Sequence, residues 1–274
     1  MSKLKFDGQF FSFISGIAIN AGLKILKEYK KKKEVYYKND GSPVTMADKI
    51  ANEYIIKTLT EYDSQIPILS EESSPSSSLL DSEIFWAVDP LDGTKEFLSN
   101  RPDFTVNIAL IKNTYPVFGV VYAPIYDILW AGYHDRNDNN YSKSYKLTQA
   151  SEEIKNTDLA WKKISVDKEP LTTIILTSKS HRSNKLDAWI NKNYKNHNIE
   201  VIEKGSSLKI CFVADGSGHL YPRFGRTCVW DTAAGHAIVN SSGGSVTIMG
   251  TKSELQYKKS IYNNEFLVSN ESYC

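Results

Sequence analysis

The sequence has few cysteines, few arginines and almost no net charge. Its three cysteines, Cys211, Cys228 and Cys274, show no metal-ligand spacing and cannot all pair, so they indicate a reducing compartment. The 33 basic and 32 acidic residues leave a formal charge of +1, which excludes a global field that would hold the protein on nucleic acid or on an acidic membrane. Hydrophobic residues make up 41% of the 274 positions, so the chain is not wholly disordered and can bury a core without disulfides or a metal.

Long uninterrupted apolar runs are also missing. The most apolar stretch, residues 10–26, is shorter than the roughly 20 apolar residues that a membrane-spanning helix needs. Four polar residues interrupt it: Ser12, Ser15, Asn20 and Lys24. No small-residue cleavage site follows, so we expect no signal peptide. The stretch predicts a buried first helix, no transmembrane segment and a cytoplasmic protein, with peripheral attachment to the cytoplasmic face of the inner membrane left open.

Helical and strand patterns alternate along the rest of the chain. Helices are predicted near residues 45–59, 183–193 and 232–240, and one from about 207; strands are predicted near 66–69, 84–88, 104–111, 117–122, 128–132, 173–177, 219–222, 246 and 266, and one that ends near 203. The polar region 134–170 fits a loop, an edge strand or a domain junction. Because both halves mix helices and strands, we expect layered α/β sheets in one domain, 1–274, with lobes of about 1–150 and 151–274.

The most informative segment is WAVDPLDGTKEF, residues 86–97. A buried strand delivers Asp89 at its carboxyl end, the usual place for a site in an open α/β sheet, and the turn that follows lets Asp89 and Asp92 point at one locus. Gly93 and Thr94 start a helix whose free N–H groups can receive a phosphate oxygen. Carboxylates beside an anion site make electrostatic sense only with cations between them, and hard oxygen ligands favour Mg²⁺.

The alternative is that Asp89 and Asp92 only shape a turn and cap a helix. Two further carboxylates weaken that alternative. Glu71 ends the preceding strand, 18 residues upstream of Asp89, and Asp231 opens an apolar helix in the segment WDTAAG. Asp231 alone is readily explained as an N-cap. Four carboxylates at element ends, beside a glycine-bearing anion turn, favour a common site over four independent caps.

These segments resemble the two signatures of the inositol monophosphatase superfamily, a group of Mg²⁺-dependent, lithium-sensitive phosphatases. The resemblance runs from about residue 41 to 244 and is closest to the bacterial 3'(2'),5'-bisphosphate nucleotidase branch, the CysQ type. Four segments carry that branch: DGSPVTMAD (40–48), DGTKEF (92–97), GSSLK (205–209) and YPRFG (221–225). Inositol monophosphatases usually carry Thr-Asn or a similar pair where this chain has Lys95-Glu96. The resemblance implies an αβαβα sandwich of the inositol monophosphatase and sugar phosphatase type.

The resemblance also implies roles for individual residues. The ligands of two or three Mg²⁺ ions would be Glu71, Asp89, Asp92, Asp231 and the Leu91 carbonyl. Asp48 would pair with the Thr94 hydroxyl to orient and deprotonate the attacking water, with Glu71 also in the catalytic set and Gly93 and Thr94 on the phosphate. This agrees with elementary chemistry, because a metal-activated water is a usable nucleophile near neutral pH and two cations can clamp an in-line displacement.

Arginine placement bears on the substrate. The chain has five arginines against 28 lysines, and Arg182, Arg223 and Arg226 lie in the second half. Arginine suits forked phosphate contacts, and a substrate with a second phosphate needs such a basic shelf. In the resembling nucleotidases, residues at four positions contact the nucleotide and its retained phosphate: His181, Ser206, Lys209 and Arg223. Each is also explained as an ordinary loop, helix or surface residue.

We therefore expect a phosphatase that removes the 3'-phosphate from 3'-phosphoadenosine 5'-phosphate, giving AMP and phosphate. By resemblance the sulfated form is a second candidate substrate, which would place the enzyme in sulfur metabolism. One alternative is an inositol or sugar monophosphatase, and another is a non-catalytic regulatory protein that binds phosphometabolites. We expect inhibition by lithium, a small-molecule nucleotide as the only partner class, and no nucleic-acid partner. Monomer and homodimer both stay open.

Overall fold

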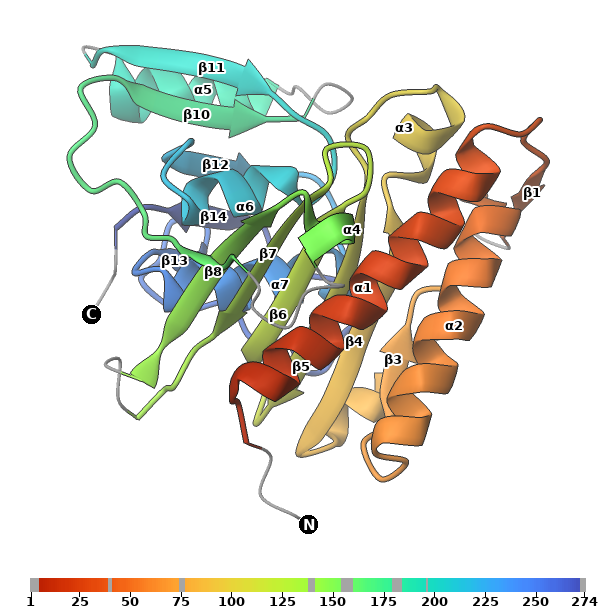
Figure 1. The fold of residues 1–274 in the computed structure, drawn as a ribbon. Helices are drawn as coiled ribbons and strands as arrows, with labels where there is room; N and C mark the ends of the chain where they lie inside the picture. Colours follow the sequence, from red (N-terminus) through yellow and green to blue (C-terminus); the bar gives the residue numbers. More distant parts are fainter. Residues whose placement is uncertain are drawn as a thin grey trace.

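A large, mostly antiparallel sheet forms the centre of the first half of the chain (Figure 1). The computed structural model describes residues 5–38, 41–73, 77–137, 141–153, 160–178, 184–195 and 197–271. In this part of the chain, seven strands pair in sequence order, and only the first two are parallel to each other. They are β3 (Ile68–Ser70), β4 (Ile84–Asp92), β5 (Thr105–Lys112), β6 (Tyr115–Ala123), β7 (Ile128–Tyr133), β8 (Lys143–Thr148) and β9 (Lys162–Lys163).

A second sheet is built from the second half of the chain. Among the described residues it has five strands in the order β11-β10-β12-β14-β13, with β10 parallel to both β11 and β12. The strands are β10 (Thr173–Thr177), β11 (Ile199–Glu203), β12 (Leu220–Arg223), β13 (Ser245–Ile248) and β14 (Phe266–Ser269). A small hairpin of β1 (Val35–Tyr37) and β2 (Pro43–Thr45) stands apart from both sheets.

Helices separate and cover the sheets. Helices α1 (Gly8–Tyr29) and α2 (Met46–Tyr62) cover one face of the large sheet, while α6 (Leu208–Ala214) and α7 (Val229–Ser241) lie between the two sheets. Alternation along β4 produces these layers, because Trp86 packs with α1 and α2 whereas Phe85 packs in the α6–α7 layer. Short helices α3 (Thr94–Leu98) and α4 (Ala150–Glu153) lie in connections.

The fifth layer is α5 (Asn184–Tyr194), on the outer side of the second sheet. On β10, Leu176 packs inward with α6 and α7, so its neighbour Thr177 faces the other way. Leu186 of α5 lines a small cavity together with Thr177 and Pro222, which places α5 on that outer side. The predicted αβαβα sandwich is confirmed.

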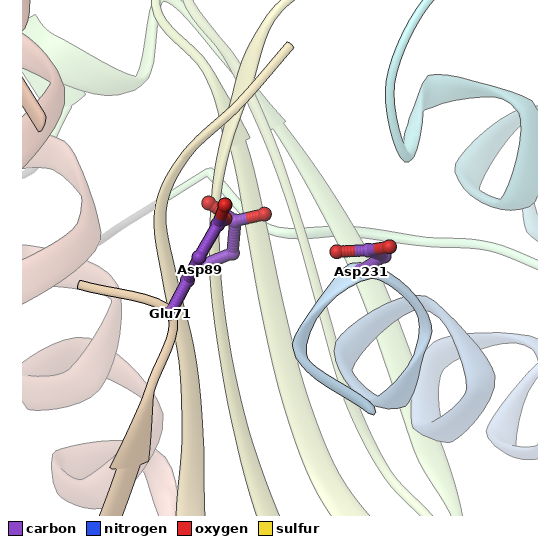
Figure 2. A group of neighbouring side chains, drawn as sticks. All are labelled: Glu71, Asp89 and Asp231. Atoms are coloured by element: carbon purple, nitrogen blue, oxygen red, sulfur yellow. The ribbon is translucent and has the colours of Figure 1, made fainter. Parts of the chain in front are cut away.

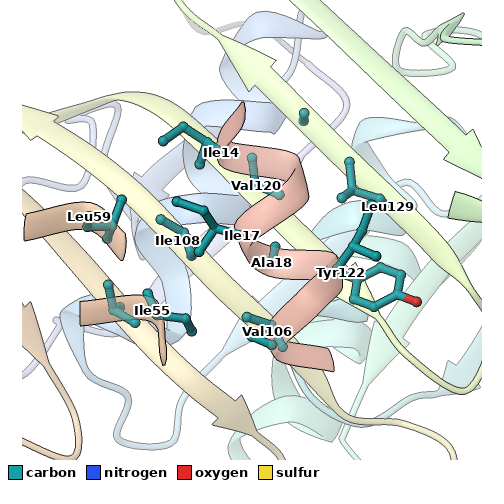
Figure 3. Packing of buried hydrophobic residues seen from close by; sticks show 14 of the residues in the cluster. Ile14, Ile17, Ala18, Ile55, Leu59, Val106, Ile108, Val120, Tyr122 and Leu129 are labelled. Carbon is teal, nitrogen blue, oxygen red and sulfur yellow. The ribbon is translucent and has the colours of Figure 1, made fainter. Parts of the chain in front are cut away.

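Helix α1 is part of the core. Asp7 caps its first turn by accepting a hydrogen bond from the Phe10 amide at 3.0 Å. Ile14, Ile17 and Ala18 pack on the large sheet, as Figure 3 shows, and all three are at most 1% exposed. By length and composition, α1 is the one helix among the described residues that would be able to cross a membrane. Most of its apolar residues are buried within the structure.

Several predicted elements differ in detail from those observed. Region 134–170, for which three alternatives were open, contributes β8, the short helix α4 and the edge strand β9. The last long helix begins at Val229, three residues before the predicted start, and the hairpin strand β1 was not predicted. Exposed short strands such as β1 bury no side chain and therefore leave no alternating pattern in the sequence.

Candidate active site

Three carboxylates from distant parts of the chain converge at one end of the large sheet. Glu71 follows β3, Asp89 lies on the adjacent strand β4, and Asp231 lies in the first turn of α7. One oxygen of each lies within 4.8 Å of the others. Figure 2 shows the Asp231 carboxylate directed across the gap toward Asp89. We call Glu71, Asp89 and Asp231 the acidic cluster.

Asp231 is oriented by the start of its own helix. Cys228 is the N-cap of α7, and its backbone N–H donates to Asp231 Oδ2 at 2.7 Å, while Ser207 Oγ lies 2.8 Å from the Asp231 carbonyl. Asp231 is therefore the third helical residue, so its interpretation as an N-cap is wrong. Capping occupies one oxygen of the carboxylate, and the other is left for the cluster.

The acidic cluster is electrostatically unfavourable without a cation. Burial first, and then the neighbouring carboxylates, raise the pKa values of Asp89 and Asp231 well above the ordinary value. Burial also raises the pKa of Glu71, although Lys38 opposes that shift. Three hard oxygen donors that repel one another in this way match the ligand set of a divalent cation such as Mg²⁺.

Lys38 and Glu72 belong to the same region, and the sequence did not identify either as part of it. Lys38 Nζ lies 2.8 Å from Glu71 Oε1 and 2.7 Å from Glu72 Oε1. The two carboxylates raise the pKa of Lys38 even though burial alone would lower it, and burial raises the pKa of Glu72 to about 7. The lysine supplies one positive charge at the edge of the cluster, which only partly compensates its negative charge. The adjacent pair Glu71-Glu72 was the one available sequence signal.

Asp92 lies next to the acidic cluster but is held differently. Its Oδ2 accepts three short hydrogen bonds, from Ser206 Oγ at 2.6 Å and from Ser207 N and Oγ at 2.7 and 2.6 Å. These donors saturate Oδ2 and leave Oδ1 to face a cation. Asp92 is not among the three residues whose oxygens lie within 4.8 Å of one another. The structure thus brings three of the four predicted acidic ligands together and sets the fourth beside them.

Asp48 and Thr94 form a hydrogen-bonded pair. Asp48 is 1% exposed; its Oδ2 accepts from Thr45 N and Oγ1 at 2.7 and 2.6 Å, and its Oδ1 accepts from Thr94 Oγ1 at 3.2 Å. Thr94 Oγ1 also lies 3.3 Å from the Leu91 carbonyl, the predicted backbone ligand. Burial raises the pKa of Asp48 despite the three donors. The structure brings the predicted pair together, and its catalytic role remains a prediction.

Gly93 shapes the turn between Asp92 and Thr94. Its φ is +97°, in the left-handed region, and a Cβ there would lie 3.0 Å from the Asp103 carbonyl oxygen. Only glycine fits this conformation without strain, so Thr94 can begin α3 directly after Asp92. Gly93 also lines the cavity described next.

A cavity of about 140 Å³ adjoins the acidic cluster, and Asp92 and Asp231 form part of its wall. Predicted substrate contacts that line it are Ser206, Lys209 and Arg223, whereas His181 and Arg182 lie outside the described residues. Lys209 is 4% exposed and donates to the carbonyls of Lys204 and Ser206 at 3.1 and 2.6 Å. Burial lowers its pKa to about 8. Lys209 is therefore a buried cation in the wall, not a solvated helix residue.

Arg223 and Ser206 both line the cavity, but they differ in which of their hydrogen-bonding groups are already used. Arg223 Nη2 lies 3.3 Å from the Arg226 carbonyl, and its buried Nε has no hydrogen-bond partner among the described residues. That open donor in a cavity wall suits an anionic group. Ser206 instead directs its hydroxyl at Asp92, so it contributes first to ligand orientation. Arg226 stacks on Tyr262, with its guanidinium carbon 3.7 Å from the ring centroid, and does not line the cavity.

Known sequences resemble this chain over most of its length. The sequence profile of the inositol monophosphatase family matches residues 8–273. The protein named 3'(2'),5'-bisphosphate nucleotidase CysQ in Buchnera aphidicola is 40% identical over 240 residues, 85% of this chain and 82% of that protein. Its namesake in Escherichia coli strain K12 is 37% identical over 257 residues, 92% of this chain and 96% of that protein.

Solved structures agree. CysQ from Bacteroides thetaiotaomicron, described as a bacterial member of the inositol monophosphatase family, matches with a TM-score of 0.84 and 34% identity, over 98% of this chain and 100% of that chain. An inositol monophosphatase from Thermotoga maritima has a TM-score of 0.70, over 96% of this chain and 92% of its own, but at 20% identity it shows the fold alone. The family profile covers nearly the whole chain, and the five layers and the acidic cluster are consistent with it. This protein belongs to the inositol monophosphatase family.

Proposed function

We propose that the protein hydrolyses the 3'-phosphate of 3'-phosphoadenosine 5'-phosphate and so produces AMP and inorganic phosphate. The observation that carries this proposal is the cavity that joins the acidic cluster to two basic residues. Asp231 and Asp92 form one part of its wall, while Lys209 and Arg223 form another. A bisphosphate can place its reacting phosphate at the carboxylates and its retained phosphate at the basic residues. The names and the identity of the bacterial relatives support the same activity.

The acidic cluster fits Mg²⁺ as cofactor. Glu71, Asp89 and Asp231 would hold it directly, with Asp92 Oδ1 and the Leu91 carbonyl as further donors to a total of two or three ions. Bound Mg²⁺ would supply Lewis acidity toward water and would neutralise the phosphate oxygens. The hydrogen bonds from Ser206 and Ser207 hold the Asp92 carboxylate in one orientation.

Asp48 and Thr94 are the proposed base for the attacking water. Because the Thr94 hydroxyl donates to Asp48, its lone pairs are free to accept a hydrogen bond from a water on the side of the cluster. As the water oxygen bonds to phosphorus and the bond to the 3'-oxygen breaks, one water proton passes to the Thr94–Asp48 pair, and the 3'-oxygen takes up a proton from solvent water to leave as the 3'-hydroxyl of AMP. The raised pKa of Asp48 favours its acting as a proton acceptor.

Arg223 and Lys209 are the proposed selectors of a second phosphate. The unpartnered Nε of Arg223 can donate to a phosphate oxygen, and the buried Lys209 ammonium adds positive charge behind it. An inositol or sugar monophosphate has no group to place there, so this alternative leaves both cations in the wall unused. The sulfated nucleotide presents the same reacting phosphate and is proposed as a second substrate.

Lithium inhibition is part of the same proposal. A compact cage of carboxylate oxygens accepts Li⁺, which supplies half the charge of Mg²⁺. We expect lithium to inhibit where sodium at equal ionic strength does not, since sodium controls for screening of a charged nucleotide. Equal inhibition by both salts would leave only an ionic-strength effect.

A phosphate-release panel tests the proposal. The purified protein is assayed with 3'-phosphoadenosine 5'-phosphate, its sulfated form and inositol 1-phosphate, each with Mg²⁺ and with a chelator. We expect the bisphosphate nucleotide to have the highest kcat/KM and all turnover to need the metal. A preference for inositol 1-phosphate would support a monophosphatase, and nucleotide binding without turnover would support a regulatory protein.

A further inference from the structure

A chain of polar groups crosses the otherwise apolar layer between the two sheets. Its centre is formed by His236 on α7 and Tyr257 on the loop before β14, and both side chains are 0% exposed. His236 Nδ1 lies 3.1 Å from Tyr257 Oη, and Tyr257 Oη donates to Thr232 Oγ1 at 3.0 Å. Neither residue touches the acidic cluster, and the reaction proposed above does not use them.

The direction of each hydrogen bond in this chain follows from the partners. Since the Tyr257 proton goes to Thr232, His236 Nδ1 must donate to Tyr257. Thr232 Oγ1 in turn lies 3.4 Å from the Cys228 carbonyl, to which it can donate. On the far side, His236 Nε2 lies 3.2 Å from Glu254 Oε1. Tyr257 Oη therefore accepts from His236 and donates to Thr232, which fixes the tyrosine side chain in place.

The outer end of the chain is anchored by a forked ion pair. Arg136 Nη1 and Nη2 donate to the two Glu254 oxygens at 2.9 and 2.8 Å, and Asn240 Nδ2 donates to Glu254 Oε1 at 2.9 Å. Arg136 also stacks on Tyr115, with its guanidinium carbon 3.5 Å from the ring centroid. Arg136 and Asn240 thus hold the Glu254 carboxylate beside His236 Nε2, an atom that has no hydrogen-bond partner in the described part of the chain.

The inner end of the chain reaches the acidic cluster through the first turn of α7. Thr232 follows Asp231 in sequence, and Asn263 Nδ2 donates both to Thr232 Oγ1 at 3.0 Å and to the Cys228 carbonyl at 2.7 Å. Cys228 is the residue whose N–H caps the Asp231 carboxylate. The residues on both sides of Asp231 are therefore held by the same set of side chains.

We propose that Tyr257 and His236 are positioning residues for the metal site. Through Thr232 and Asn263 they hold the first turn of α7 so that the Asp231 carboxylate stays within reach of Glu71 and Asp89 although the three repel one another. Without this support, Asp231 moves away from Glu71 and Asp89 in the metal-free protein. Part of the free energy of Mg²⁺ binding is then used to bring the carboxylate back. The result is weaker binding of Mg²⁺ with little change of the chemical step once the metal is saturating.

This inference rests on the proposed metal dependence, and thermal stabilisation by Mg²⁺ tests it without an activity assay. Melting temperatures of wild type and of Tyr257→Phe are measured over a range of Mg²⁺ concentrations. The matched control is Tyr122→Phe, because Tyr122 is also 0% exposed and its hydroxyl donates to Asp127 at 2.8 Å, in the core on the other face of the large sheet. A second pair, Thr232→Val and Thr232→Ser, removes or keeps the hydroxyl at the inner end.

We expect the Kd for Mg²⁺, fitted from the rise of the melting temperature with Mg²⁺ concentration, to increase about 3- to 10-fold in Y257F and T232V, below the 10- to 100-fold typical of direct partners of a ligand. Y122F and T232S should keep the wild-type Kd. An unchanged Kd in Y257F and T232V, with melting temperatures lowered as in Y122F, would overturn the positioning role. Failure of Mg²⁺ to stabilise the wild type would instead overturn the proposed metal dependence.

Discussion

The acidic cluster and the hydrogen-bonded side chains around His236 are both buried and polar, yet their charges are arranged in opposite ways. Around His236, burial would raise the pKa of Glu254, but bonds to His236 and Arg136 lower it to about 2. In the cluster, burial and like charge raise the pKa of Asp89 well above its ordinary value. Folding pairs the Glu254 carboxylate with positive charge, whereas it leaves the carboxylates of the acidic cluster repelling one another. Such a conflict is typical of a site that is completed by a ligand.

The largest effect expected from this difference is that of Asp89→Asn. The change removes a buried charge and a metal ligand while keeping the shape of the side chain. Turnover should fall at least about 1,000-fold, because several kcal/mol of charge stabilisation are lost. The melting temperature of the metal-free protein should rise, because Glu71 and Asp231 lose a like charge. Phosphate release and calorimetry check the two halves. Near-normal turnover would show that Asp89 only shapes the turn. A lower melting temperature of the metal-free variant would contradict the claim that the three carboxylates repel one another.

Ser207→Ala tests how the ligand beside the cluster is held. Two of the three short hydrogen bonds to Asp92 Oδ2 come from Ser207, and the substitution removes the one from its hydroxyl. We expect the Mg²⁺ concentration that gives half-maximal turnover to rise about 10- to 100-fold, as when other partners of metal ligands are lost. Ser242→Ala is the matched control, because that buried hydroxyl donates only to the Val239 carbonyl at the far end of α7. Equal loss in both variants would show that Asp92 needs no such support.

Arg223→Ala separates substrate selection from chemistry. Its guanidinium lines the cavity away from the reacting atoms, so KM for 3'-phosphoadenosine 5'-phosphate should rise about 10- to 100-fold while kcat is largely kept. Adenosine 3'-monophosphate, which has no second phosphate, should be hydrolysed as well by the variant as by the wild type. Steady-state kinetics on both substrates provide the comparison. A uniform loss on the two would make Arg223 a structural residue.

The smallest expected effect is a pH dependence of the stability that Glu254 contributes. The pKa of Glu254 lies near 2 in the folded protein and at its ordinary value of 4.5 when unfolded. A lowered pKa contributes stability in full above pH 4.5, and the contribution is lost as pH falls toward 2. The melting temperature of Glu254→Gln should therefore lie below that of the wild type at pH 6, and the gap should narrow below pH 4.5. A gap that is constant across pH 3–6 would contradict this assignment.

Sequence patterns predicted most of the fold because the buried elements carry a clear period. The apolar runs of β4 and α1 reflect burial of the strand on both faces and of the helix against the sheet, so they are visible without a structure. Element ends also indicated the site. Glu71, Asp89 and Asp231 each follow or open such an element, and the structure brings their oxygens together.

Contacts between segments that are far apart in the sequence left no pattern in it. Ser207 and Asp92 are 115 residues apart, and Lys38 reaches Glu71 across 33 residues. Such pairs are set by how the layers pack, which no local period records. No role was predicted for Tyr257 or His236 for the same reason, since their partners come from different elements.

Identification of the nucleotide product tests most directly the central claim that the acidic cluster and the adjoining cavity remove a 3'-phosphate. The protein is incubated with 3'-phosphoadenosine 5'-phosphate and Mg²⁺, and the products are separated by ion-exchange chromatography beside a D89N sample and a chelated sample. We predict AMP with its phosphate on the 5'-oxygen, one inorganic phosphate per AMP, and no product in either control. Adenosine 3'-phosphate as product, or the same yield from D89N, would contradict the claim.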